Sequence, residues 1–185
     1  MGQDKAEAYS PYATAPSRLL VKLSDFGFSS PLADCCDDDA FRSRARSYGL
    51  RLVEGQCGVG AINFAVAEDL HALGFVFLGS MLSALAEVGP VASAARSVPP
   101  SDEDSLQRLL GDIFDGDFEG FREYALDEEA WSEVSDLLDE NEGAGWDLLR
   151  QMCGAREKAG KIGDDGGVML SARGLLRNPI FGQGR

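Results

Sequence analysis

Oxygen-bearing side chains alternate along residues 115–120. Asp115, Asp117 and Glu119 are followed by Gly120, which matches the first ligand positions and the central glycine of an EF-hand calcium loop. A hard cation prefers such oxygens. However, the position at which an EF-hand places its last, bidentate glutamate is Leu126, and Asp127 comes one residue too late. Because the cage is not closed there, we expect no metal ion at this segment.

Cys57 is a candidate nucleophile. The sequence Gly55-Gln56-Cys57-Gly58 resembles the glycine-flanked cysteine of papain-like proteases, in which a histidine activates the thiolate. The resemblance covers four residues, because Val59 and Gly60 stand where that family continues with Ser-Cys-Trp. The single histidine, His71, also lies much nearer in sequence than the histidine of that family. The resemblance implies a cysteine-dependent enzyme that uses Cys57 and His71. The other interpretation is that Cys57 is a small buried cysteine beside a glycine turn. We favour this interpretation and therefore expect that the protein is not an enzyme.

The remaining cysteines predict no second site. Cys35 and Cys36 are adjacent and precede three aspartates, whose negative charge opposes thiolate formation. Together with Cys57 and Cys153 they match neither a disulfide framework nor the ligand spacing of a zinc site. The phosphate-binding motifs of nucleotide-dependent enzymes do not occur in the sequence either. We therefore expect a cytoplasmic protein without a bound cofactor.

No membrane segment is predicted. The N-terminal sequence MGQDKAEAYSPYATAPS has no apolar run after its charges, so it does not match a secretory signal. Residues 58–88 are rich in apolar side chains, but Glu68, Asp69 and His71 interrupt them before the roughly 18 uninterrupted apolar residues that are typical of a span. We expect this segment to lie inside a soluble fold.

The charge is distributed very unevenly along the chain. The protein has 185 residues and a formal net charge of −14. Residues 101–149 contain 17 acidic residues and only two basic ones, Arg108 and Arg122, whereas residues 1–100 carry a net charge of −3 and residues 150–185 one of +4. Such asymmetry indicates either an interaction surface or a helical face that only keeps the protein soluble.

The acidic segment is patterned as helices. Leucine and aromatic residues recur at intervals of three and four residues, and glycines such as Gly116, Gly143 and Gly154 can end the helices. Four helices are predicted, around residues 101–116, 118–125, 127–143 and 146–154. Their apolar stripes would face inward and their carboxylates would face water. The acids are therefore expected on an ordered scaffold.

The first hundred residues have a different pattern. Short apolar or alternating runs predict strands at 18–23, 50–54 and 75–78, and helices are predicted at 40–48 and 81–88. Residues 59–73 fit both classes, because 62–66 is typical of a strand and 65–73 of a helix. The predicted fold class is α+β: a small sheet with helices in the N-terminal part, followed by an acidic helical layer.

Four parts are expected along the chain, and Pro99 and Pro100 mark the main internal boundary. The last part is basic and glycine-rich, and a hairpin in it would join 161–162 to 168–171. The parts are a flexible N-terminus (1–17), a small α/β portion (18–98), an acidic helical portion packed on it (101–154) and the C-terminal segment (155–185).

Arg42, Arg44, Arg46 and Arg51 form the one basic cluster of the first hundred residues. One interpretation is a contact with phosphate. The other, which the net charge of −14 favours, is that these arginines balance acids within the molecule or in a second copy. We therefore expect no direct binding of nucleic acid.

The charge distribution favours a protein that binds another protein. Carboxylates on ordered helices can occupy the positions that phosphates take among Lys and Arg side chains. We expect a partner with a basic surface, such as a nuclease or another nucleic-acid-binding protein, for which this chain acts as an inhibitor, immunity factor or nucleic-acid mimic. The side chains expected to contact it are Asp112, Asp115, Asp117, Glu119, Glu123, Glu128, Glu129, Glu133 and Asp136.

An apolar docking surface is the alternative within the binding class. A chaperone or assembly adaptor would contact its partner through side chains such as Phe118, Phe121 or Trp131, and the acids would serve solubility alone. Salt separates the two hypotheses, because ionic binding weakens as ionic strength rises whereas apolar docking barely responds. The sequence is also compatible with a homodimer.

Overall fold

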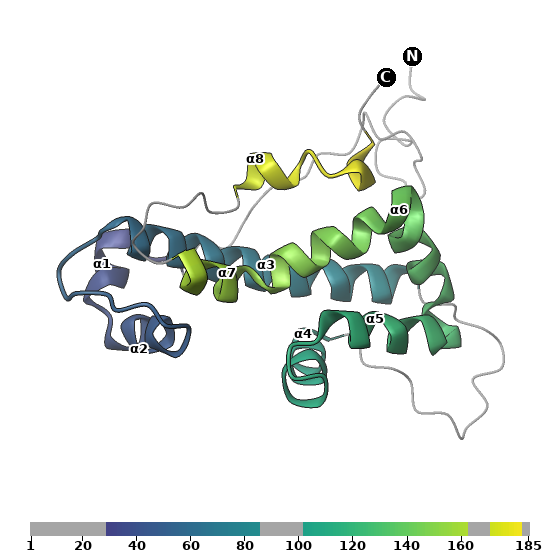
Figure 1. The fold of residues 1–185 in the computed structure, drawn as a ribbon, viewed down its shortest axis with the longest axis horizontal. Coiled ribbons are helices and arrows are strands. Elements are labelled where there is room, and N and C mark those ends of the chain that lie inside the picture. The colour runs from purple at the N-terminus through teal and green to yellow at the C-terminus, as the bar shows by residue number, and fades with distance from the viewer. Residues whose placement is uncertain (1–28, 86–101, 163–170, 183–185) are drawn as a thin grey trace, which may run out of the picture. The chain divides into compact units, whose positions relative to one another are not determined.

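The computed structural model describes residues 29–85, 102–162 and 171–182, and every regular element in these ranges is helical (Figure 1). Residues 1–30 and 31–185 belong to separate compact units, and all elements below lie in the second. In chain order they are α1 (Leu32–Asp37), α2 (Asp39–Ser47), α3 (Val59–Leu85), α4 (Glu103–Arg108), the π-helical turn η3 (Leu109–Ile113), α5 (Phe118–Asp127), the 3₁₀ turn η4 (Glu129–Trp131), α6 (Ser132–Cys153), α7 (Ala155–Ile162), α8 (Ala172–Leu175) and the 3₁₀ turn η5 (Pro179–Phe181).

The predicted α+β fold class is wrong, because the described residues contain no β-strand. Residues 75–78, predicted as a strand, lie within α3, as does the ambiguous segment 59–73. Residues 50–54, also predicted as a strand, connect α2 to α3 without regular structure. The cause is the composition of α3: a helix that is apolar around its whole circumference shows no helical periodicity in its sequence.

Some predicted elements lie outside the described residues. These are the flexible N-terminus at 1–17, the strand at 18–23, the end of the helix at 81–88 beyond Leu85 and most of the C-terminal hairpin. The described end of that hairpin, Lys161 and Ile162, belongs to α7.

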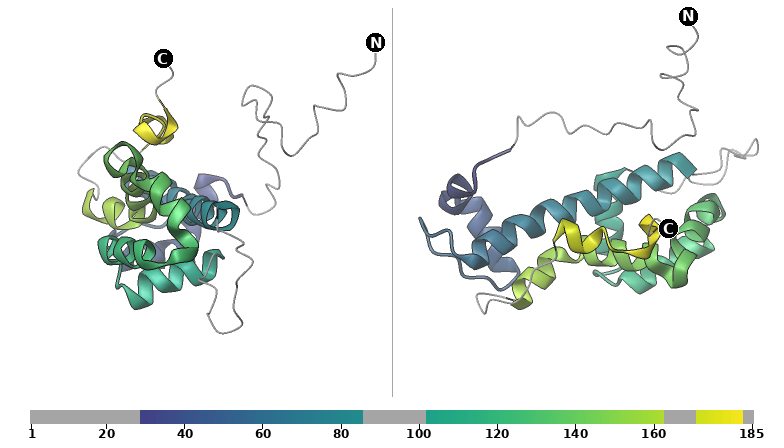
Figure 2. Two further views of the ribbon diagram at one scale, coloured as in Figure 1. Left: turned by 90° about the vertical axis from the view of Figure 1, so that its right-hand side faces the viewer. Right: turned by 90° about the horizontal axis from the view of Figure 1, so that it is seen from above.

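The helix α3 is central to the packing of the described elements. It has 27 residues and makes its most extensive contacts with α6 and α7 (Figure 2). A Cβ atom added to Gly74 would lie 3.0 Å from Cys153 Sγ and 3.0 Å from Met152 Cβ. The missing side chain at this position therefore lets α3 approach α6 closely.

The same helix contains the one stretch of the described residues, Val59–Ser83, that is long and apolar enough to cross a membrane. Length and composition alone do not separate such a span from the core helix of a soluble fold.

An aromatic cluster forms the core beneath the acidic helices. Phe118 and Phe121 of α5 pack against Trp131 of η4 and Trp146 of α6, and α3 contributes Phe75 to the same cluster. The rings of Phe121 and Trp146 meet edge to face, with centroids 6.4 Å apart, a geometry that aromatic quadrupoles favour. This core is why the acidic segment is ordered.

A second cluster joins α2, α3 and α7 and is built largely of smaller side chains. Phe41 and Phe64 pack there with Ala67 of α3 and Ala159 of α7. Small residues bring the helix backbones together: a Cβ atom at Gly160 would lie only 1.9 Å from the carbonyl oxygen of Tyr48. The residue that follows α2 and the helix α7 are therefore in direct backbone contact.

The predicted helix boundaries of the acidic segment are largely confirmed. The helix α6 is interrupted at Glu140–Gly143, where Asn141, Glu142 and Gly143 have φ angles of 52°, 64° and 79°. This interruption separates the two predicted helices that end at Gly143 and begin near Trp146. Gly154 ends α6, as predicted.

Candidate acidic interface

The acidic segment keeps its charge on the outside of the helices. Eight of the nine side chains predicted to contact a partner are exposed, and Glu128 is half-buried. They extend from η3 through α5 and η4 into the first turns of α6. The structure therefore brings the predicted residues onto consecutive, ordered helices. They are Asp112, Asp115, Asp117, Glu119, Glu123, Glu128, Glu129, Glu133 and Asp136.

The segment that partly matches a calcium loop is a tight turn between two helices. Asp115 and Gly116 have φ angles of 51° and 76°, a left-handed conformation that Asp and Gly tolerate best. Asp117 then caps α5, because its Oδ1 accepts the backbone N–H groups of Glu119 at 3.1 Å and Gly120 at 3.2 Å. Within the described part of the chain, no group of three or more His, Cys, Asp or Glu side chains is arranged to hold a metal ion.

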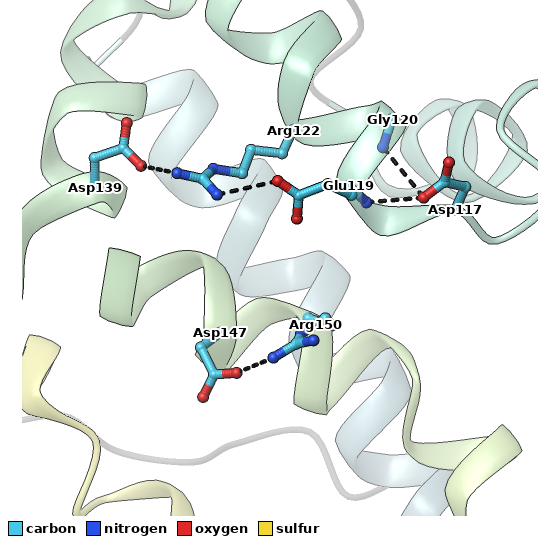
Figure 3. Close-up of polar contacts among 7 residues, drawn as sticks. All are labelled: Asp117, Glu119, Gly120, Arg122, Asp139, Asp147 and Arg150. Carbon is cyan, nitrogen blue, oxygen red and sulfur yellow. Dashed lines mark hydrogen bonds and ion pairs between the residues drawn. The ribbon is translucent and has the colours of Figure 1, made fainter. Parts of the chain in front are cut away.

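Arg122 connects α5 to α6 (Figure 3). Its guanidinium donates to Glu119 Oε1 at 3.1 Å and to Asp139 Oδ1 at 2.7 Å. The hydrogen bond with Asp139 is the largest of the effects that raise the pKa of Arg122 above its usual value. Glu119 is therefore partly neutralised, and its position is fixed.

Two further contacts order the same surface. Burial raises the pKa of Tyr124, and so do the charge of Glu128 and its hydrogen bond with the phenol. Arg150 pairs with Asp147 one turn earlier in α6 (Figure 3). Both contacts leave most carboxylates of residues 101–149 in solvent.

Three arginines of α2 and α7 pair with acids outside residues 101–149. Arg42 pairs with Asp39 and lies 3.8 Å from Glu54, and Arg44 Nε donates to Glu68 Oε2 at 2.9 Å. Arg156 Nε lies 2.6 Å from Glu68 Oε1, at an angle that makes it an ion pair rather than a hydrogen bond. For Arg42 and Arg44, this agrees with the charge-balancing interpretation. Every ion pair that an acidic-segment carboxylate forms among the described residues is with Arg122 or Arg150.

Cys57 and His71 do not form a catalytic pair in this structure. Cys57 is joined to Cys36 by a disulfide, with Cα atoms 5.7 Å apart, so it has no free thiol. Val59 and His71 are twelve residues apart in one helix, a rise of about 18 Å. His71 Nδ1 instead contacts the carbonyl oxygen of Cys153 at 2.6 Å.

The environments of His71 and Cys153 favour their uncharged forms. Burial, followed by the charge of Arg156, lowers the pKa of His71. Burial also raises the pKa of the Cys153 thiol to about 12. The Cys153 thiol is therefore not activated as a nucleophile near neutral pH, and His71 is mainly neutral there.

The aromatic residues of the adaptor hypothesis are not available to a partner. Phe121 and Trp131 are each 1% exposed, and Phe118 is 9% exposed. The exposed apolar side chains with regular spacing lie on α3 instead: Val59, Ile62, Val66, Leu73 and Val76. The three contact residues named by the adaptor hypothesis are therefore buried. The exposed apolar surface with regular spacing lies on α3.

Sequence reasoning missed three features. The disulfide between Cys36 and Cys57 has no signal in its spacing, and the two arginines on Glu68 come from helices far apart in the chain. The exposed stripe on α3 does have a signal, a 3–4 spacing of apolar residues. Apolar residues on the other faces of the helix hide it.

No family model, curated protein or solved structure shows a significant match to this chain.

Proposed function

We propose that this protein binds a basic protein through the acidic interface and inhibits it by occupying the place of nucleic-acid phosphates. The observation that supports this proposal is the separation of the charges. Arg42 and Arg44 of α2 and Arg156 of α7 pair with carboxylates outside residues 101–149. Among the described residues, Arg150 is the one cation from outside residues 101–149 that forms an ion pair with a carboxylate of this segment, so these ion pairs leave most of its net charge of −15 in place. A surface of this kind accelerates encounter with a cationic partner.

Preorganisation is the second support. The interface residues stand on helices held by the aromatic core, by the cap at Asp117 and by the bridge from Arg122. A partner therefore does not have to order these carboxylates, and the entropy loss of binding is smaller than for a flexible acidic tail. On α5 and α6, carboxylates recur within one or two helical turns, as at Glu119 and Glu123 or Glu133 and Asp136. Such spacing allows several Lys or Arg side chains to be engaged together.

Charge reversal tests the proposal. The test variant replaces Asp112, Glu123, Glu133 and Asp136 with Lys, and the matched control replaces Asp34, Asp37, Glu54 and Glu157 with Lys. All eight residues are exposed, and each set changes the net charge from −14 to −6. Partners are recovered from cells of the source organism by affinity purification at low and at moderate salt. Binding of the recovered partner is then measured by titration calorimetry.

The proposal expects a basic partner that is lost at higher salt, competes with DNA or RNA, and binds the control variant nearly as well as the wild type. The test variant should lose affinity by at least a factor of about 100, since each desolvated charge pair contributes on the order of 1 kcal/mol or more. Equal affinities of the two variants would overturn the proposal, and so would a partner that salt does not release.

A further inference from the structure

The helix α3 presents an apolar stripe to solvent on the face opposite its core contacts. Val59, Ile62, Val66, Leu73 and Val76 are between 38% and 54% exposed. The stripe continues to the exposed residues Ser80 and Ser83. Buried residues of the same helix, such as Phe64 and Leu78, face the two core clusters. The stripe is therefore extra apolar surface, which the described elements of this chain do not cover.

The spacing of the exposed positions on α3 indicates that another helix would fit the stripe. The exposed positions 59, 62, 66, 69, 73 and 76 follow one another at intervals of three and four residues. This is the spacing at which a helix receives the side chains of one other helix between its own. The apolar part from Val59 to Val76 extends over about 26 Å, or roughly five helical turns.

Asp69 indicates the charge that a helix bound to the stripe would carry. It holds the central position of the stripe, between Val66 and Leu73, and it is exposed. None of the ion pairs among the described residues involves it. A helix that covers the stripe would bury this carboxylate, which is strongly unfavourable unless a cation pairs with it. The fitting helix therefore carries Lys or Arg opposite Asp69.

A second copy and a lipid surface fit less well. Antiparallel pairing of two α3 stripes would bring two Asp69 carboxylates into neighbouring layers, between molecules that each carry a net charge of −14. A bilayer would place Asp69 in hydrocarbon without a partner. We propose that the α3 stripe is a docking site for an amphipathic helix of about five turns with one basic residue at its central core position.

Two synthetic peptides of about 18 residues and identical composition test this proposal. Both have Leu at the core positions of a heptad pattern. The first has Lys at the central core position and Glu on the outer face, and the second has these two residues exchanged. Because the peptides have the same net charge, any difference in affinity reports the central position. Binding is measured by fluorescence anisotropy of labelled peptide titrated with the full chain.

The Lys-centred peptide should bind at least roughly tenfold more tightly than the Glu-centred peptide, and the variant Asp69→Lys should reverse this order. Leu73→Asp should abolish binding of both peptides, with unchanged circular dichroism. Leu176→Asp alters an exposed apolar residue outside α3, and it should leave both affinities unchanged. The four-lysine variant of the acidic interface should also bind the peptides normally, so the two proposals fail independently.

Three results would overturn the docking proposal. The first is the absence of binding, or equal affinities that Asp69→Lys does not change. The second is a dimer, seen by sedimentation, that Leu73→Asp abolishes, which would assign the stripe to a second copy. The third is flotation with phosphatidylcholine vesicles that depends on Leu73, which would assign it to a lipid surface.

Discussion

Two regions of this protein use charge in opposite ways. Around α2, α3 and α7, guanidinium groups link one helix to the next: Arg44 of α2 and Arg156 of α7 both pair with Glu68 of α3. In α4, α5 and the first turns of α6, an aromatic core holds the helices and most carboxylates lie in solvent. The same residue type is therefore an internal link in one region and a presented surface in the other. The difference between the two regions is whether an arginine of another helix pairs with the carboxylate.

The first prediction concerns the covalent link of the region around α2, α3 and α7. The disulfide between Cys36 and Cys57 closes a loop with a sequence separation of 21. Its removal should lower the free energy of unfolding by about 3 kcal/mol through the entropy of the unfolded chain. Urea unfolding of the wild type with and without reductant measures the effect, and Cys36→Ser/Cys57→Ser is the control that reductant should not affect.

The thiol count checks the same bond. Cys35 and Cys153 are free cysteines. When the non-reduced protein is unfolded in denaturant, two equivalents of thiol per chain should therefore react with a colorimetric reagent. Four equivalents would show that the bond is absent. The two regions would then differ only in their ion pairs and core residues.

The second prediction compares an internal carboxylate with a presented one. Glu68→Gln should lower the free energy of unfolding by about 1–2 kcal/mol, because it leaves the half-buried Arg156 and the exposed Arg44 without their shared anion. Glu133→Gln removes an exposed carboxylate and should change the free energy of unfolding by about 0.5 kcal/mol or less. Chemical denaturation of both variants measures the difference. Equal effects would remove the distinction between the two regions.

The third and smallest effect is a dependence of stability on pH. Burial holds the pKa of His71 below its ordinary value of 6.5 in the folded state, so the unfolded chain binds the proton more readily. The stabilisation is complete above about pH 6.5 and is lost as pH falls towards the folded pKa. Denaturation at several pH values should show the free energy of unfolding decreasing on acidification. His71→Asn should show a shallower decrease, and an unchanged slope would contradict the assignment.

The acidic helices could be predicted from the sequence because their signals are local. Leucine and aromatic residues recur at helical spacing, and Gly143 and Gly154 mark helix ends, so the boundaries near these glycines were confirmed. The exposure of eight of the nine candidate carboxylates follows from the same pattern.

The α3 region could not be predicted in the same way. Apolar side chains surround this helix, so residues 75–78 resembled a strand between two glycines. In the structure, Gly74 instead marks the place where α3 meets α6. The disulfide and the arginines on Glu68 join residues that only the tertiary fold brings together, and periodicity has no information about such contacts.

The contact between Gly160 and Tyr48 has a consequence for the ion pairs beside it. Arg156 lies one turn before Gly160 in α7, and a methyl group at 160 would collide with the backbone that follows α2. Any larger residue there would have to push α7 outward and carry its guanidinium away from Glu68. The absence of a side chain at Gly160 therefore allows Glu68 to pair with both Arg44 and Arg156.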